Sequence, residues 1–78
     1  MTNGYKLTQK DLINLNLKPT KAKEYYIEQS GWSCKFFNMY EIVKNEYGLF
    51  KGALIIEGDK LTGDQEDYII RNCKHEEY

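Results

Sequence analysis

The side chains best suited to nucleophilic or metal chemistry are two cysteines, Cys34 and Cys73, and the single histidine, His75. Nucleophilic catalysis would need a thiol beside His75 and a third group to orient the imidazole, and no such group can be identified. Cys73 and His75 stand two positions apart, a spacing that does not place two ligands on one helix face. No Cys-x-x-Cys or His-x-x-x-His pattern occurs. We therefore expect reduced, partly buried thiols, no bound metal and no cofactor.

Carboxylates are numerous in the second half of the chain and could form the pair that general acid–base catalysis uses. They are Glu57, Asp59, Asp64 and Asp67. Their places are a turn and a helix start, where acidic side chains have structural roles. The six glycines are scattered, so no glycine-rich phosphate loop is present. The sequence therefore predicts a protein that is not an enzyme.

Lysines gather in the first part of the chain. Residues 1–45 carry seven lysines against four acids, while residues 46–78 carry four basic residues against eight acids. A basic face could neutralise the phosphates of a nucleic acid. A solvated surface is the alternative, because lysine is mostly exposed in any protein. The lysines concerned are Lys6, Lys10, Lys18, Lys21 and Lys23.

The clearest signals for structural elements lie between Leu7 and Ile27. Thr8 can cap a helix through its hydroxyl, and Asp11 stands three residues later, where the second member of a capping box belongs. Asn16 can adopt the left-handed conformation that ends a helix. Pro19 favours the first turn of a following helix. These signals predict a helix-turn-helix unit over about residues 7–30.

The second helix of this unit would begin at Pro19 and Thr20. Ala22, Tyr25 and Tyr26 follow at helical spacing. Ala22 is small at the point where two helices would cross closely. We expect the outer side of this helix to carry lysines.

The stretch from Trp32 to Tyr47 fits two periods. A helical stripe has Ser33 as its cap and Gly48 as its stop. A strand-like alternation is also present, and aromatic and β-branched residues favour it. The helical stripe is longer and has both end signals, so we predict a third helix. The stripe consists of Phe36, Tyr40, Val43 and Tyr47, and the alternating set of Trp32, Cys34, Phe36, Tyr40 and Ile42.

Leu49 to Ile56 predicts a short buried strand, because it ends in a continuous apolar run before the turn signal Gly58-Asp59. A lone strand leaves its backbone groups unpaired. Its partner could be Tyr5–Leu7, the residues after the turn, or a second copy of the chain.

A last helix is predicted from Thr62 and Gln65, which match a capping box. Its apolar side would consist of Tyr68, Ile69, Ile70 and Cys73. Residues Glu76–Tyr78 are expected to fray.

These elements predict one α+β domain over residues 1–78, with the helix-turn-helix unit at about 7–30 and the remainder at 31–78. In chain order it would contain the helix-turn-helix unit, a third helix, a short strand or hairpin and a C-terminal helix. A core of this size contributes roughly 3–5 kcal/mol of stability, and such chains often rely on a partner. No stretch is apolar and long enough to span a membrane, and no leader precedes the domain, so we expect a cytoplasmic protein.

The run Asp11-Leu12-Ile13-Asn14-Leu15-Asn16-Leu17-Lys18-Pro19-Thr20-Lys21-Ala22-Lys23-Glu24 resembles the opening of small proteins carried by phages and integrative elements of Gram-positive bacteria. Those proteins are similar to excisionase-like helix-turn-helix proteins. The match covers about a quarter of the chain. After Ile27 the sequence lacks the basic wing that such DNA binders place behind the second helix.

The resemblance and the charge pattern favour a DNA-associated regulator or excision factor of a mobile element. Its second helix would enter the major groove with Thr20, Lys21, Lys23 and Glu24 facing base edges. Lys6, Lys10 and Lys18 would hold phosphates. One small unit offers little contact area, so the hypothesis includes a homodimer.

The alternative hypothesis is a phage-encoded inhibitor or adaptor that binds a host protein, such as a defence factor. Tyrosine rings suit contact surfaces because each joins an apolar body to a polar tip. The acidic second half would form the rest of the surface. The residues assigned to it are Tyr47, Glu57, Asp59, Asp64, Asp67 and Tyr68.

Overall fold

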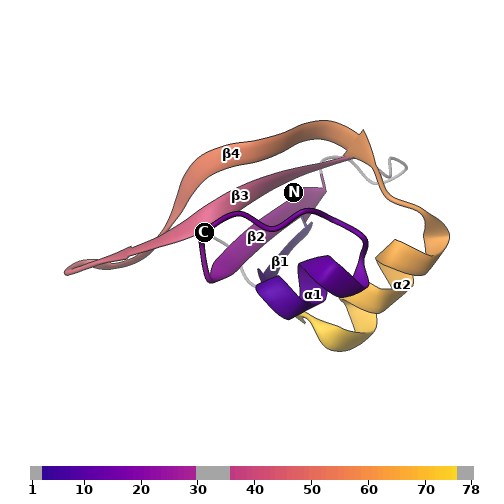
Figure 1. Cartoon of the computed structure of the whole chain (residues 1–78), viewed down its shortest axis with the longest axis horizontal. Coiled ribbons are helices and arrows are strands. Elements are labelled where there is room, and N and C mark those ends of the chain that lie inside the picture. Colours follow the sequence, from indigo (N-terminus) through magenta and orange to yellow (C-terminus); the bar gives the residue numbers. More distant parts are fainter. Residues whose placement is uncertain (1–2, 30–35, 76–78) are drawn as a thin grey trace.

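Five strands and two helices make up the described part of the chain, residues 3–29 and 36–75 of the computed structural model (Figure 1). The strands pair antiparallel in the order β4-β3-β2-β1-β5. In chain order the elements are β1 (Asn3–Thr8), α1 (Gln9–Asn14), β2 (Glu24–Gln29), β3 (Phe36–Asn45), β4 (Gly48–Lys60), α2 (Gly63–Asn72) and β5 (Lys74–His75).

The predicted helix-turn-helix fold is wrong. The stretch from Leu7 to Ile27 holds one helix, α1, and the residues expected in the second helix form a loop and the strand β2. Tyr25, Tyr26 and Ile27 are all buried. Three consecutive buried side chains fit a central strand that is covered on both faces. The structure is therefore mostly an antiparallel sheet, and residues 7–29 contain no second helix that could serve as a recognition helix.

The local signals around α1 are confirmed. The Thr8 hydroxyl accepts a hydrogen bond from the Asp11 amide at 3.3 Å, and the Asp11 carboxylate accepts one from the Thr8 amide at 2.9 Å. Asn16 has a φ of 58°. The Leu17 amide then donates to the Leu12 carbonyl oxygen at 2.8 Å, as in a Schellman motif. The helix therefore ends at the position that the sequence predicts.

The predicted third helix is also wrong, and its strand alternative holds for the described residues. Phe36–Asn45 is β3, which pairs with β2 and β4. Phe37 and Met39 are buried in the core under the helices, while Tyr40 lies opposite Tyr26. Because both faces of the strand carry apolar side chains, some of these residues also fall at helical spacing by coincidence. The proposed cap Ser33, and the alternating residues Trp32 and Cys34, lie outside the described residues.

The predicted strand at Leu49–Ile56 is present within the longer strand β4, but the prediction that it is buried is wrong, because β4 is an edge strand whose residues are exposed or only partly buried. Its partner is β3, which was expected to be helical, so none of the candidate partners was right. The expected turn at Gly58-Asp59 lies inside β4. β4 needs 13 residues to follow the 10 residues of β3, and the pairing register shifts at three places. Such bulges bend a strand, and β4 arches over the sheet in Figure 1.

The C-terminal helix is confirmed as α2. The Thr62 hydroxyl accepts from the Gln65 amide at 3.2 Å, and the Gln65 side chain accepts from the Thr62 amide at 2.9 Å. α2 carries the chain from one edge strand, β4, to the opposite edge strand, β5. The fraying expected at Glu76–Tyr78 concerns residues outside the described part.

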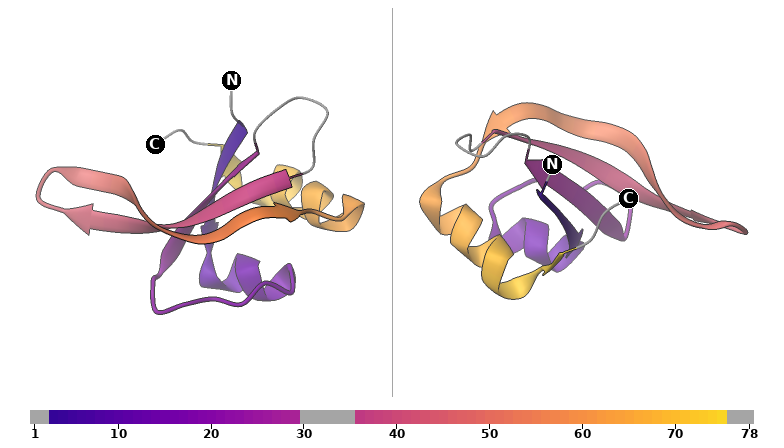
Figure 2. Two further views of the ribbon diagram at one scale, coloured as in Figure 1. Left: turned by 90° about the horizontal axis from the view of Figure 1, so that it is seen from above. Right: turned by 180° about the vertical axis from the view of Figure 1, so that it is seen from behind.

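Both helices lie on the same face of the sheet, as two further views show (Figure 2). The main core fills the space between them and the strands. Its buried members are Leu7, Leu12, Leu15, Tyr25, Ile27, Phe37, Met39, Leu61 and Ile69. The hairpin formed by β3 and β4 extends past this helix-covered body and gives the molecule its longest dimension, 36 Å (Figures 1 and 2).

Candidate protein interface on the projecting hairpin

The residues assigned to base recognition lie on a loop and a strand edge. Lys21 and Lys23 are exposed in the loop between α1 and β2. The Thr20 hydroxyl donates to the Glu41 carboxylate of β3. Glu24 begins β2, and its carboxylate lies 2.8 Å from the Lys6 ammonium. These residues therefore cannot enter a major groove as part of a helix.

The loop itself is braced by hydrogen bonds. The Gln9 side chain donates to the carbonyl oxygens of Thr20 at 3.2 Å and Ala22 at 2.6 Å. The Thr20 amide donates to the Tyr25 hydroxyl at 2.9 Å. Lysines project from and beside this fixed backbone, and no described acidic side chain pairs with them. The exposed lysines in and beside this loop are Lys10, Lys18, Lys21 and Lys23.

The residues assigned to protein binding do not form one surface. Tyr47 is 80% exposed at the tip of the hairpin, whereas Glu57 and Asp59 lie toward the other end of β4. Asp64 and Asp67 are exposed on α2. The structure therefore separates the aromatic tip from the acidic residues.

Tyr68 of the same set is engaged inside the protein. Its hydroxyl donates to the Asp11 carboxylate at 2.8 Å and accepts from the Asn14 side chain at 3.0 Å. These bonds tie α2 to α1, so Tyr68 holds the two helices together.

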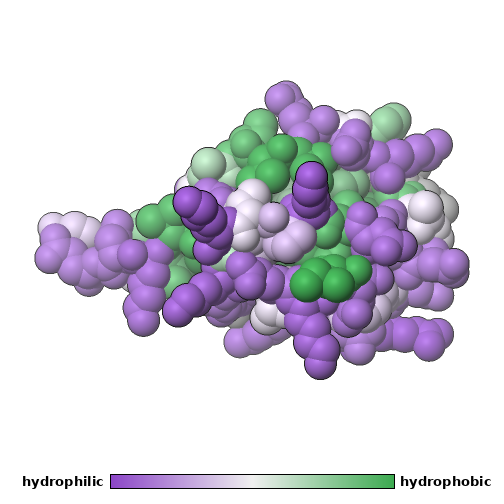
Figure 3. Space-filling model, viewed as in Figure 1, coloured by the Kyte–Doolittle hydropathy of each residue, from purple (hydrophilic) through white to green (hydrophobic). Residues whose placement is uncertain are grey.

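The most distinctive exposed feature is the part of the β3–β4 hairpin beyond the helices. Val43 and Phe50 pair across the ladder, and 46% and 44% of their surfaces are exposed. Leu54, farther along β4, is 45% exposed, but it pairs with Tyr40 and therefore lies on the opposite face of the sheet from Val43 and Phe50. Hydrophobic residues gather over β4 and the base of the hairpin in the space-filling view (Figure 3). Exposed apolar side chains that gather on one surface mark interaction sites in soluble proteins.

The tip is built by a short turn. The Asn45 side chain accepts a hydrogen bond from the Tyr47 amide at 2.8 Å, and Gly48 has a φ of 124°. Asn45 and Gly48 pair directly, so two residues connect the strands. Asparagine and glycine at these places are a hairpin signal, which the helical interpretation of Trp32–Tyr47 overlooked.

On the opposite face of the sheet, a lysine of β4 contacts β2 and β3. The Lys51 ammonium lies 4.6 Å from the ring centre of Tyr40 and 6.0 Å from that of Tyr26. It is 3.4 Å from the Glu28 carboxylate, which also accepts a hydrogen bond from Tyr40 at 3.0 Å. Burial and the bond to Glu28 raise the pKa of Tyr40. This cluster, Lys51, Tyr26, Tyr40 and Glu28, is called the lysine cradle below.

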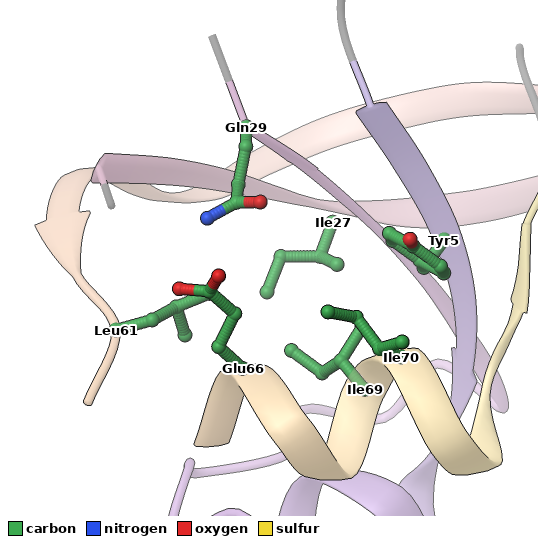
Figure 4. A pocket seen from close by; sticks show the side chains of 7 residues that line it. All are labelled: Tyr5, Ile27, Gln29, Leu61, Glu66, Ile69 and Ile70. Atoms are coloured by element: carbon green, nitrogen blue, oxygen red, sulfur yellow. The ribbon is translucent and has the colours of Figure 1, made fainter. Parts of the chain in front are cut away.

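A small cavity of about 10 Å³ lies between α2 and the sheet (Figure 4). Ile27, Leu61 and Ile69 contribute apolar walls, and the Glu66 carboxylate and the Gln29 amide point toward each other across it. One Glu66 oxygen is buried without a hydrogen-bond partner. The volume corresponds to about one water molecule, which is too little for a substrate.

Cys73 offers little nucleophilic chemistry, because burial raises the pKa of its thiol to about 12 and the thiolate is the reactive form. Within residues 3–29 and 36–75, no cluster of metal-ligating side chains occurs. Cys34 lies outside the described residues.

Comparison with protein-family models, with curated proteins and with solved structures finds no match. Among the described residues, no helix has the length and apolarity needed to cross a membrane.

Proposed function

We propose that this protein is a non-enzymatic binding protein that engages a partner protein through its β3–β4 hairpin. The observation that carries the proposal is the pair Val43 and Phe50, which stand opposite each other and remain about half exposed beyond the helix-covered body. Burying this pair against another protein would remove apolar surface from water. The function falls in the inhibitor or adaptor class, with a host protein as partner and the cytoplasm as location.

Three features support the hairpin as the contact element. It projects from the body, so a partner can reach both of its faces (Figure 2). Tyr47 places an aromatic ring at its tip, and tyrosine is enriched among the side chains that dominate binding energy. Antiparallel pairing holds the strands in register from Ile42 to Lys51, which limits the ordering entropy lost on binding.

The test is site-specific cross-linking in a lysate of the source cells. A photoreactive phenylalanine derivative replaces Tyr47 in one sample and Ile13, which is 62% exposed on α1, in the other. We expect one partner band from position 47 and none from position 13. The band should disappear in the Val43→Ser/Phe50→Ser variant.

The matched control is the variant Ile13→Ser/Ile70→Ser, which removes two exposed apolar side chains from the helices. It should keep the cross-link from position 47. Equal cross-linking from both positions, or a band that survives the hairpin substitutions, would refute the proposal.

A second candidate function is nucleic-acid binding by the braced lysine loop. Lys10, Lys18, Lys21 and Lys23 are exposed without a described acidic partner, and such lysines release counterions when they contact phosphates. Four contacts would give a slope of about −3 to −4 for log K against log salt on duplex DNA. Origin from a phage or mobile element stays a prediction.

The salt dependence is measured by fluorescence anisotropy with a labelled duplex, and the Lys21→Ala/Lys23→Ala variant should lower the slope by about two. The control Lys44→Ala/Lys60→Ala alters two exposed lysines of β3 and β4. No binding at low salt, or equal losses in both variants, would exclude this candidate.

A further inference from the structure

The hairpin joins the body at an interruption of the sheet. Tyr40 of β3 pairs with Leu54 of β4, and Ile42 pairs with Lys51. The two β3 residues are two positions apart, whereas their β4 partners are three positions apart. The register therefore shifts at Gly52 and Ala53, and a bulge leaves backbone groups there out of the ladder. Of the three register shifts between β3 and β4, this one lies nearest the tip of the hairpin.

The lysine cradle spans this interruption. Lys51 belongs to β4, and its ammonium reaches across β3 to the Glu28 carboxylate of β2 at 3.4 Å. Between the two strands it passes the face of Tyr40, whose ring centre lies 4.6 Å away. A cation over an aromatic face is attracted by the ring quadrupole, more so when water is excluded. One side chain thus links an edge strand to the second strand inward.

The cradle holds its shape through contacts of its own. The Tyr40 hydroxyl donates to Glu28 at 3.0 Å, on the carboxylate oxygen that Lys51 does not contact. The Glu28 side chain is 14% exposed, and Tyr26 is buried. A carboxylate so far withdrawn from water is destabilised when its cation is removed. Lys51 therefore has a fixed acceptor rather than a mobile surface partner.

The other face of the same junction is closed by Val43. A Cβ atom on Gly52 would overlap Val43 Cγ2 and approach the Glu41 carbonyl oxygen to 3.1 Å. Val43 therefore lies directly against the Gly52 backbone. Val43 therefore packs against the junction on one face, and Lys51 contacts the cradle residues on the other.

We propose that Lys51 keeps the β3–β4 hairpin rigid relative to the body, through the contacts of its ammonium with Tyr26, Tyr40 and Glu28 in the lysine cradle. This role of Lys51 is called the latch. The value of the latch for partner binding rests on the proposed function, since it would present Val43 and Phe50 in a fixed pose. The latch itself is a property of the isolated protein. Lys51 is a positioning residue and needs no contact with the partner.

Hydrogen exchange measured by NMR on the isolated chain tests the latch. In Lys51→Met we expect the protected amides of residues 42–50 to exchange about fivefold or more faster, as the strength of a partly shielded cation–π and ion-pair contact implies. Amides in the β1–β2 ladder should change much less. Lys51→Arg, which keeps a cation, should retain most of the protection.

The matched control is Lys44→Met, which removes an exposed lysine from the same hairpin. It should leave the exchange of the hairpin amides unchanged. Equal acceleration in Lys51→Met and Lys44→Met would overturn the proposal. So would acceleration by the same factor in both ladders, because that pattern means general loss of stability.

This outcome is separable from the cross-linking result. If exchange in Lys51→Met is unchanged while position 47 still cross-links to one partner, only the further inference is removed. The expected faster exchange in Lys51→Met, with no partner captured from position 47, would remove only the proposed function.

Discussion

The Tyr25 hydroxyl donates a hydrogen bond to the Ala22 carbonyl oxygen at 2.8 Å, three residues back along the chain. The Tyr25 side chain is buried, so this bond ties the loop before β2 to the core of the sheet. The same hydroxyl accepts from the Thr20 amide. Tyr25, together with Gln9, therefore holds the loop that the sequence predicts to be a recognition helix.

Tyr25→Phe should loosen this loop. Removing the hydroxyl leaves the Thr20 amide without its partner, and we expect the free energy of unfolding to fall by about 1–2 kcal/mol. Trypsin should then cut faster after Lys21 and Lys23, which mass spectrometry of timed digests can follow. Tyr47→Phe, at an exposed tip, is the control. Unchanged cleavage in Tyr25→Phe would show that the loop is held by other contacts.

Gly52→Ala should destabilise the hairpin junction, because the added methyl group would overlap Val43. Overpacking of this kind lowers the free energy of unfolding by about 1–3 kcal/mol, measurable by urea denaturation. Combining it with Val43→Ala should recover part of the loss. Gly63→Ala is the matched control, since nothing lies within 4 Å of a Cβ there. Similar losses in both glycine variants would argue against a tight junction.

Thr62→Ala should weaken α2 by removing the acceptor for the Gln65 amide. The expected loss in the free energy of unfolding is about 1 kcal/mol. Thr62→Ser keeps the hydroxyl and should remain close to wild type. Both variants can be compared by thermal denaturation under identical conditions. A loss that is equal in the serine and alanine variants would assign the effect to the methyl group.

Cys73 should make the protein less stable at alkaline pH. Its folded pKa is raised from 9.0 to about 12, so between these values the unfolded chain loses the proton while the folded chain keeps it. The stabilising contribution is complete below pH 9 and declines as the pH rises toward 12. Urea denaturation at several pH values from 8 to 10.5 should show a shallower decline for Cys73→Ala than for wild type. Parallel declines would contradict the assignment.

The positions of the lysines in the sequence correctly indicated a basic region, but they did not indicate which lysines share a surface. Lys6 and Glu24 were assigned to one DNA surface, yet they contact each other across the β1–β2 ladder. Lys21 and Lys23 remain exposed as expected, but on a loop. Spacing along a presumed helix placed them on one face that does not exist.

The hairpin site was missed except for Tyr47. The predicted helical stripe includes Val43, and the predicted buried strand Leu49–Ile56 includes Phe50 and Leu54, so none of the three is predicted as a contact residue. The exposure of Val43 and Phe50 follows from how far the helices extend over their face of the sheet, which depends on α1 and α2 together. Asn45 and Gly48 around a two-residue connection were the local signal that could have revealed it.

The sequence by itself determined where both helices start, because the capping bonds of Thr8 with Asp11 and of Thr62 with Gln65 join residues three positions apart. It also determined that Gly48–Lys60 would contain a strand. Only the tertiary structure decided that Glu24–Gln29 and Phe36–Asn45 are strands. Their aromatic residues fit either period, and the choice came from backbone pairing with distant segments and from burial on both faces of the sheet. Such long-range pairing has no signature within a short window of sequence.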